Sequence, residues 1–396
     1  MKHLIHTLLL LGILAATACQ TAPRESGPEP SEADSPEAVD EPEEPLPYPP
    51  EVMANAREVP QEEMQRVFET VRAPYKHGVV IQPEEGELVD CPNVFRYEGR
   101  WYMVFASNRD NVGYETHLAV SDDLLNWERL GSILPFEENQ GWDKWQAAGG
   151  LALFDTEWGG SNTIERFDGR YWMTYIGGEL QGYETDPLSA GIAYTDTPNE
   201  ARPWNRWEGN PFFTHDQPDA RWFEAATVYK THAIRDPDES LGYPFVMFYN
   251  GKEKGGNGHE AIGMAVSNDM RNWRRMGDTH LIYHTGESRW AITGDPQITR
   301  MGDLWVMFYF GAFWKPNAFD TFACSYDLVN WTTWDGPHLV EPSEPWDRQF
   351  AHKPWVIKHD GVVYHFYCGV GENGRVIALA TSEDLRESEA PAGREE

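Results

Sequence analysis

The sequence predicts an all-β fold in which a unit of several strands is repeated around a common axis. One recurring pattern opens a unit with a polar residue, a short strand, a Gly-containing turn and an aromatic strand, at 90–105, 295–309 and 352–367. A second pattern, Ser-x-Asp-Leu-x-Asn-Trp or a close variant, ends a unit at 121–127, 267–273, 325–331 and 382–385. A period of roughly 50–70 residues with several strands per unit is typical of a β-propeller. Counting two irregular starts and one degenerate end, we predict five blades.

The closing pattern has a chemical explanation. Ser and Asp side chains bond to the backbone a few residues further on, which favours a turn between the third and fourth strands of a unit. A β-sandwich with chance echoes is the alternative fold, and four matching turns argue against it.

The first 19 residues are predicted to be a signal peptide. Lys2 and His3 precede an apolar run at 8–14 that is too short to span a bilayer, and small residues then lead into Cys19. This ending resembles the bacterial lipoprotein signal, which implies that Cys19 is lipidated. An ordinary secretory signal with an incidental Cys is the alternative. We therefore expect an extracytoplasmic bacterial protein, lipid-anchored on the periplasmic or cell-surface side.

The segment between the signal and the repeats has two parts. Residues 20–50 are predicted to be a disordered, acidic, Pro/Glu-rich tether, because they contain too few apolar residues to offset the entropy of ordering. Residues 51–74 are predicted to be helical, since Pro60 suits a first turn and a four-residue apolar face follows it. That face consists of Met64, Val67, Phe68 and Val71.

The predicted propeller domain covers residues 75–388, and residues 389–396 are a flexible tail. Tyr75–Ile81 is expected to be a strand that closes the ring from outside the repeats. The remaining cysteines, Cys91, Cys324 and Cys368, have no metal-type spacing, so buried free thiols are expected, with a Cys324–Cys368 bridge as the alternative. A formal net charge of −32 argues against nucleic acid as a partner.

The residues around Asp90, acid-x-Pro-x-Val followed by Gly-x-Trp-Tyr, together with the closing turns, resemble the five-bladed glycoside hydrolases of families 43, 32, 117 and 130. The resemblance spans about Tyr75 to Leu385, and it is specific for the fold rather than for one family. It implies a glycosidase, of the family 43 kind, that cleaves a plant or algal poly- or oligosaccharide by carboxylate acid/base catalysis.

The resemblance also implies catalytic residues. It places one acid at the start of the first blade, here Asp90, and a Glu at the start of the third, here Glu224. Hydrolysis needs a proton donor that stays protonated and a second carboxylate. The apolar neighbours Phe223 and Ala225 favour a raised pKa for Glu224 as the acid, and Asp90 is then the base or nucleophile.

The second blade departs from the family pattern, because the position expected for its carboxylate falls on Gly160-Ser161-Asn162. We assign Asp295 as the third, supporting carboxylate, with Asp155 or Glu157 as alternatives. Further residues predicted to bind the substrate are Arg109, Asp110, Trp145, Trp222, His352, Lys353 and Trp355. Exposed aromatic faces stack on sugar rings, although packing between blades is the alternative for each Trp.

No cofactor is expected to be required. The resemblance implies calcium on the propeller axis near His352 as one option, and a neutral His352 that donates a hydrogen bond as the other. Two rival functions are a family 130-like phosphorylase, with Lys353 and Arg109 as phosphate-binding cations, and a non-catalytic carbohydrate-binding lipoprotein. The sugar, the linkage and the oligomeric state are left open.

Overall fold

The computed structural model describes residues 44–136, 141–255, 258–372 and 374–386. The chain divides into two units, Met1–Glu41 and Pro42–Glu396, and only the second contains described residues. The predicted signal peptide, Cys19, most of the tether and the tail at 389–396 therefore lie outside the described residues. Among the residues that are described, no helix is both long and apolar enough to cross a membrane.

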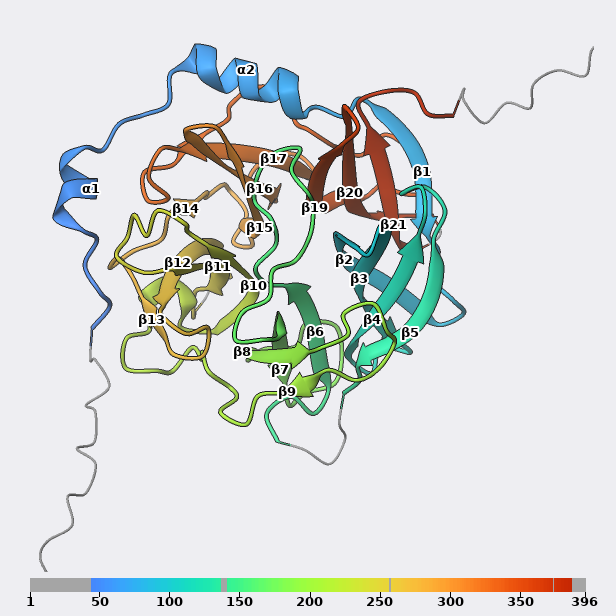
Figure 1. Ribbon diagram of the computed structural model, residues 1–396, viewed down its shortest axis with the longest axis horizontal. Coiled ribbons are helices and arrows are strands. Elements are labelled where there is room, and N and C mark those ends of the chain that lie inside the picture. The colour runs from blue at the N-terminus through green and yellow to red at the C-terminus, as the bar shows by residue number, and fades with distance from the viewer. Residues whose placement is uncertain (1–43, 137–140, 256–257, 373, 387–396) are drawn as a thin grey trace, which may run out of the picture. The chain divides into compact units, whose positions relative to one another are not determined.

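In the described unit, antiparallel sheets follow one another around a common centre (Figure 1), which is the arrangement of a β-propeller. One sheet joins the first strand to the last three, in the order β1-β21-β20-β19. Its strands are β1 (Tyr75–Ile81), β19 (Phe350–His359), β20 (Val362–Gly371) and β21 (Gly374–Thr381). β1 runs antiparallel to β21. The prediction that residues 75–81 close the ring from outside the repeats is confirmed.

Two other sheets lie between these ends. The first, with strand order β10-β11-β12-β13 and β14 paired to β12, consists of β10 (Thr227–Arg235), β11 (Phe245–Lys252), β12 (Glu260–Ser267), β13 (Trp273–Arg275) and β14 (Ile282–Tyr283). The second consists of β15 (Ile292–Met301), β16 (Leu304–Ala312), β17 (Ala318–Ser325) and β18 (Thr332–Thr333), in sequential order.

The largest sheet contains two antiparallel units that are joined by a single parallel pair, Tyr114 with Gln146. One unit is β2 (Glu87–Tyr97), β3 (Arg100–Arg109), β4 (Tyr114–Ser121) and β5 (Glu128–Leu134). The other is β6 (Gln146–Leu151), β7 (Tyr171–Gly178), β8 (Ser189–Thr195) and β9 (Asn205–Arg206).

The predicted Ser-x-Asp turns connect third and fourth strands. Ser121 Oγ accepts hydrogen bonds from the backbone of Asp123 and Leu124, and Asp123 Oδ1 accepts from the backbone of Leu125 and Asn126. The same bonds recur from Ser267 to Asn272. We call the first strand of each unit its inner strand. Because antiparallel strands alternate in direction, the loops between second and third strands lie at the opposite sheet edge, beside the starts of the inner strands. We call this the strand-start edge.

The N-terminal segment packs on the outside of the ring. It contains α1 (Pro50–Ala54) and α2 (Gln61–Val71), and all four residues of the predicted apolar face of α2 are buried. Packing begins before the predicted end of the tether at residue 50. The backbone N–H of Leu46 bonds to Arg275 O at 2.8 Å, and Tyr48 occupies the space above Gly277. The apolar side chains at 46 and 48 explain this earlier start.

The hydrophobic core lies between neighbouring sheets. On β11 the even-numbered residues, such as Val246 and Phe248, pack with Trp305 and Met307 of the next sheet. The odd-numbered residues, such as Phe245 and Met247, pack with Trp172 of the preceding one. This alternation follows from the two-residue period of a strand. Cys324 and Cys368 are buried free thiols, as predicted, whereas Cys91 is a free thiol that is only half-buried.

Candidate active site

Four inner strands carry the same irregularity near the strand-start edge. The register shifts occur between Asp90 and Asn93 in β2, Tyr229 and His232 in β10, Gly294 and Gln297 in β15, and His352 and Trp355 in β19. The first residue inside each shift has a positive φ: Cys91 (52°), Lys230 (53°), Asp295 (53°) and Lys353 (63°). We call these four the ring residues. β-bulges re-aim side chains, and all four ring residues line one pocket.

The bulges correct one predicted equivalence. We expected Asp90 and Asp295 to occupy the same position, but the ring residue of the first unit is Cys91, and Asp90 stands one residue before it. A shift of one residue along a strand turns a side chain to the other face. Asp90 therefore corresponds to His352, whereas Asp295 is a true ring residue.

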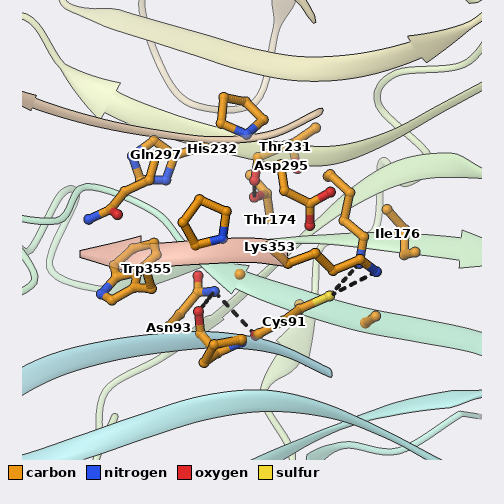
Figure 2. Close-up of a pocket in the computed structure, with 17 residues that line it drawn as sticks. Cys91, Asn93, Thr174, Ile176, Thr231, His232, Asp295, Gln297, Lys353 and Trp355 are labelled. Atoms are coloured by element: carbon orange, nitrogen blue, oxygen red, sulfur yellow. Dashed lines mark hydrogen bonds between the residues drawn. The ribbon is translucent and has the colours of Figure 1, made fainter. Parts of the chain in front are cut away.

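Two pockets meet at the ring. The axial pocket extends along the inner strands and contains Asn93, Thr174, His232, Gln297 and Trp355 (Figure 2). The edge pocket lies beside it at the strand-start edge, with about 600 Å³ of open space, and it contains three carboxylates, those of Glu184, Glu260 and Asp295. Asp295 and Lys353 line both pockets. Carboxylates that line one pocket together are what a sugar-cleaving site requires.

Glu184 is held by two lysines of the ring. It lies in the loop between β7 and β8, and its Oε1 is 3.0 Å from Lys353 Nζ and 3.2 Å from Lys230 Nζ. Burial by itself would raise the pKa of Glu184, but the lysine charges outweigh burial and lower its pKa to about 2. Glu184 is therefore an anion throughout the physiological range.

Glu260 has the opposite environment. It is the first residue of β12, it is buried, and burial raises its pKa to about 7. Burial likewise raises the pKa of Asp295 to about 6. Asn250 connects the two: its Nδ2 is 3.5 Å from Glu260 Oε2, and its Oδ1 accepts the backbone N–H of Asp295 at 2.9 Å. The edge pocket thus combines a carboxyl group that holds its proton near neutrality with a permanent carboxylate.

Asp90 lies beneath the ring and lines neither pocket. Its Oδ2 accepts hydrogen bonds from Lys353, Arg375, Tyr114 and Tyr183 at 2.9 to 3.2 Å. Burial would raise the pKa of Asp90, but Arg375 and Lys353 lower it well below its usual value. This geometry makes Asp90 an anchor for two cations.

The environment predicted for Glu224 is wrong. The apolar neighbours were expected to raise its pKa, but Glu224 Oε1 lies 2.9 Å from both Arg221 Nε and Arg275 Nε. Burial opposes these charges, yet the two arginines lower the pKa. Glu224 belongs to the short helix η1 (Trp222–Glu224), which packs over Gly251 and Gly263. Those glycines lie on the face of the sheet opposite Glu260, so Glu224 lines neither pocket.

The other predicted residues divide into two groups. His352, Lys353 and Trp355 line the pockets. Arg109, Asp110, Trp145 and Trp222 line neither of them. Arg109 pairs with Glu84, and exposed Trp222 packs edge-on against His280 and Tyr283. The alternative acids Asp155 and Glu157 also lie elsewhere, where Asp155 accepts bonds from Ser161.

The residues near His352 do not fit a calcium ion. Its Nδ1 bonds to Cys368 O at 3.0 Å and its Nε2 to Arg375 Nη1 at 3.1 Å, so both ring nitrogens are engaged. Burial lowers the pKa of His352 to about 3, which makes it a neutral imidazole. Asp90, Cys91 and Glu184 lie close enough together to hold a metal, but Lys353 bonds to both carboxylates there.

Sequence reasoning missed Glu184, Glu260, Lys230 and Arg375. One signal was available, because the Ser-x-Asp turns mark one edge of every sheet and place the loops between second and third strands at the other. Glu184 lies in such a loop, and Glu260 and Arg375 follow two more.

Comparison with known proteins indicates the family of the chain. No family model matches the chain. Two solved proteins, one in a complex with RGII and one described as a glycoside hydrolase, are each 44% identical to it, with a TM-score of 0.79. The alignments cover 83% of this sequence and 97% of each solved protein. The chain therefore belongs to the glycoside hydrolases.

More distant likenesses concern the fold alone. A thermostable family-43 glycoside hydrolase is 17% identical over 78% of this glycoside hydrolase and 94% of its own length, with a TM-score of 0.58. Structures of families 32, 130 and 117 give TM-scores of 0.51, 0.56 and 0.52 at 14% identity. A curated relative, sucrose-6-phosphate hydrolase of Bacillus subtilis (strain 168), is 38% identical over 60 residues, only 12% of its length. The predicted resemblance is confirmed.

Proposed function

We propose that this glycoside hydrolase cleaves a glycosidic bond in a plant or algal oligosaccharide, with Glu260 as proton donor and Glu184 as the second carboxylate. The observation that carries the proposal is the opposite charge state of two carboxyl groups in one pocket, with a pKa of about 7 for Glu260 and about 2 for Glu184. Environments that separate the pKa values of two carboxyl groups assign the acid and the base.

Each residue of the pocket then has a defined task. Glu260 gives its proton to the oxygen of the leaving sugar, while Glu184 either attacks the sugar carbon or removes a proton from water. Lys353 and Lys230 keep Glu184 ionised and oriented. Asp295, through its negative charge, helps to keep the proton on Glu260 and can accept a hydrogen bond from a sugar hydroxyl. In this scheme Asp90 fixes Lys353, and Glu224 fixes two arginines, so neither contacts the sugar.

The sheet order supports a propeller of five blades. The eight-stranded sheet counts as two blades because one residue pair joins its halves, and the other three sheets are one blade each. The predicted lipid anchor at Cys19 is likewise part of the proposal. Incorporation of labelled palmitate is compared between wild type and a Cys19→Ser protein. Loss of the label in the Ser protein would support the anchor, and equal labelling of the two proteins would overturn it.

The deciding experiment uses residues 44–396 and a panel of oligosaccharides that includes fragments of RGII, because a protein 44% identical to this one was solved in a complex with RGII. Product formation is followed by proton NMR for wild type, Glu260→Gln, Glu184→Gln and Glu224→Gln. We expect loss of turnover in the first two variants and retention in the third. The first anomer released gives the stereochemistry.

Three results would contradict this proposal. Turnover that survives in Glu260→Gln but is lost in Glu224→Gln would return the catalytic role to Glu224. Release of a sugar phosphate, only when inorganic phosphate is added, would make the enzyme a phosphorylase. Binding of a glycan without cleavage by wild type would favour a carbohydrate-binding protein.

A further inference from the structure

One side of the edge pocket is apolar and has no task in the cleavage step. Its side chains come from the starts of β15 and β19 and from the end of β16 and the loop that follows it: Ile292, Phe310, Phe313 and Phe350. Phe310 is buried, whereas Phe313 is 43% exposed and is the most exposed aromatic side chain of this wall. These side chains form a contiguous apolar patch inside the pocket, and a patch of this kind marks a ligand-binding surface.

The backbone of Phe313 is strained. Its φ is +65°, and Phe313 is the only aromatic residue with a positive φ among the residues that the structure describes. The other large apolar residues in this region of φ, Leu124, Met270 and Leu328, belong to the Ser-x-Asp turns and are buried. Leu153, also buried, completes the apolar set. Such strain in a bulky residue persists only when the surroundings enforce it, and it is concentrated at ligand-binding positions.

The neighbouring residue enforces this conformation. Trp314 Nε1 bonds to Ile292 O at 2.8 Å, and its ring stacks on His284 with centroids 4.0 Å apart. Gly286 has no side chain, which lets the backbone of Trp314 approach: a Cβ there would come within 2.9 Å of Trp314 Cα. Trp314 therefore fixes the loop, and Phe313 is held outward over the pocket, with its ring in edge contact with Phe350 at 5.9 Å.

We propose that Phe313 is a specificity-determining platform that stacks on the C–H face of the sugar that leaves. The inference rests on the proposed function. The bond to be cleaved lies beside Glu260, which is only 7% exposed. The sugar whose anomeric carbon forms that bond therefore occupies the buried part of the pocket. Phe313 lies on the same pocket but at its exposed part, where the rest of the glycan emerges. Aromatic rings bind the apolar face of a pyranose or furanose in this way.

The test compares two substrates that share the sugar bound in the buried part of the pocket and differ in the leaving group. One is the oligosaccharide that wild type cleaves, and the other is the corresponding glycosyl fluoride, whose leaving group has no ring. Phe313→Ala is expected to raise KM for the oligosaccharide about three- to tenfold, the range of one aromatic contact, with kcat and the fluoride KM unchanged. Phe313→Tyr should restore the wild-type KM.

A control and a stability measurement exclude a merely structural role. Tyr75→Ala removes a ring that is equally exposed, at 42%, from the outermost strand β1, and it should change neither KM. Phe313→Gly relieves the positive φ, so its Tm should equal or exceed that of wild type while the oligosaccharide KM rises. A lower Tm with an unchanged KM would overturn the proposal.

A binding measurement tests the role of Phe313 independently of whether the enzyme turns over. Glycans are titrated calorimetrically into Glu260→Gln with Phe or Ala at 313. If wild type cleaves nothing, but a glycan binds and the Ala protein binds it three- to tenfold more weakly, the proposed function fails and the platform stands. An equal rise in KM for both substrates, or no binding of any glycan, would overturn the platform.

Discussion

Glu224 and Glu260 belong to the same blade, but their pKa values are shifted in opposite directions. Both are buried, and both are associated with the sheet of β10–β14. Glu224 packs over Gly251 and meets two arginines, which keep it ionised and close it off. Glu260 pairs with Lys252 in the ladder, lies on the other face and faces the pocket, where burial raises its pKa to about 7. Burial alone therefore does not create a general acid. At Glu260 burial outweighs the lowering effects of Tyr229 and Lys252 on the pKa, and the carboxyl group lines the pocket in which it can give up its proton.

The largest expected effect is on turnover. Glu260→Gln removes the transferable proton with little change in size, and we expect kcat to fall by about 10²–10⁴. Glu224→Gln should leave kcat of the folded protein within about twofold, since Glu224 lines neither pocket. Steady-state rates at pH 6, on protein whose folding is verified by circular dichroism, distinguish the two. Similar losses of kcat in both variants would contradict the assignment of different roles to Glu260 and Glu224.

The second expected effect is on the free energy of unfolding, and here the substitution at Glu224 is the damaging one. Glu224→Gln leaves Arg221 and Arg275 without their shared anion in a buried site, and we expect it to cost about 3–5 kcal/mol in the free energy of unfolding. Urea denaturation at pH 7 measures this. Glu224→Asp, which keeps the charge, is the control and should lose less. A Gln protein as stable as wild type would show that the arginines find other partners.

Glu260 should instead reduce stability at high pH. Its pKa is 4.5 in the unfolded chain and about 7 when folded, so its contribution to folding is intact below pH 4.5 and is lost as the pH rises through 7. The shift corresponds to ~3 kcal/mol. We expect Glu260→Gln to gain this much relative to wild type between pH 4.5 and pH 8. A difference in unfolding free energy that does not vary with pH would refute the raised pKa.

The smallest effect concerns the pH profile. In wild type, kcat/KM should fall above pH 7 as Glu260 loses its proton, and the acid limb set by Glu184 lies near pH 2. Lys353→Met removes a cation 3.0 Å from Glu184, so the acid limb should move upward by about 1–2 pH units. Lys353→Arg, which retains the charge, should leave the limb in place. Equal profiles for Met and Arg would mean that Lys353 acts only as packing.

Much of the fold was available from the sequence because it depends on local chemistry. The Ser-x-Asp turns, the apolar face of 61–71 and the strand at 75–81 each follow from residues close together in the sequence, and the structure reproduces them. The opening pattern also located the ring, since Asp295, His352 and Lys353 all line the pockets. The offset between Asp90 and Asp295 was missed because a bulge is a property of two paired strands.

The sequence by itself determined a ring of antiparallel units with ionisable residues at the starts of their inner strands. Only the tertiary structure decided which acids share a pocket. Glu184, Glu260 and Asp295 come from three different units, and the charge state of each depends on lysines and apolar walls contributed by others. A pKa is set by the groups around a residue in space, and for these carboxylates most of those groups are distant in the sequence.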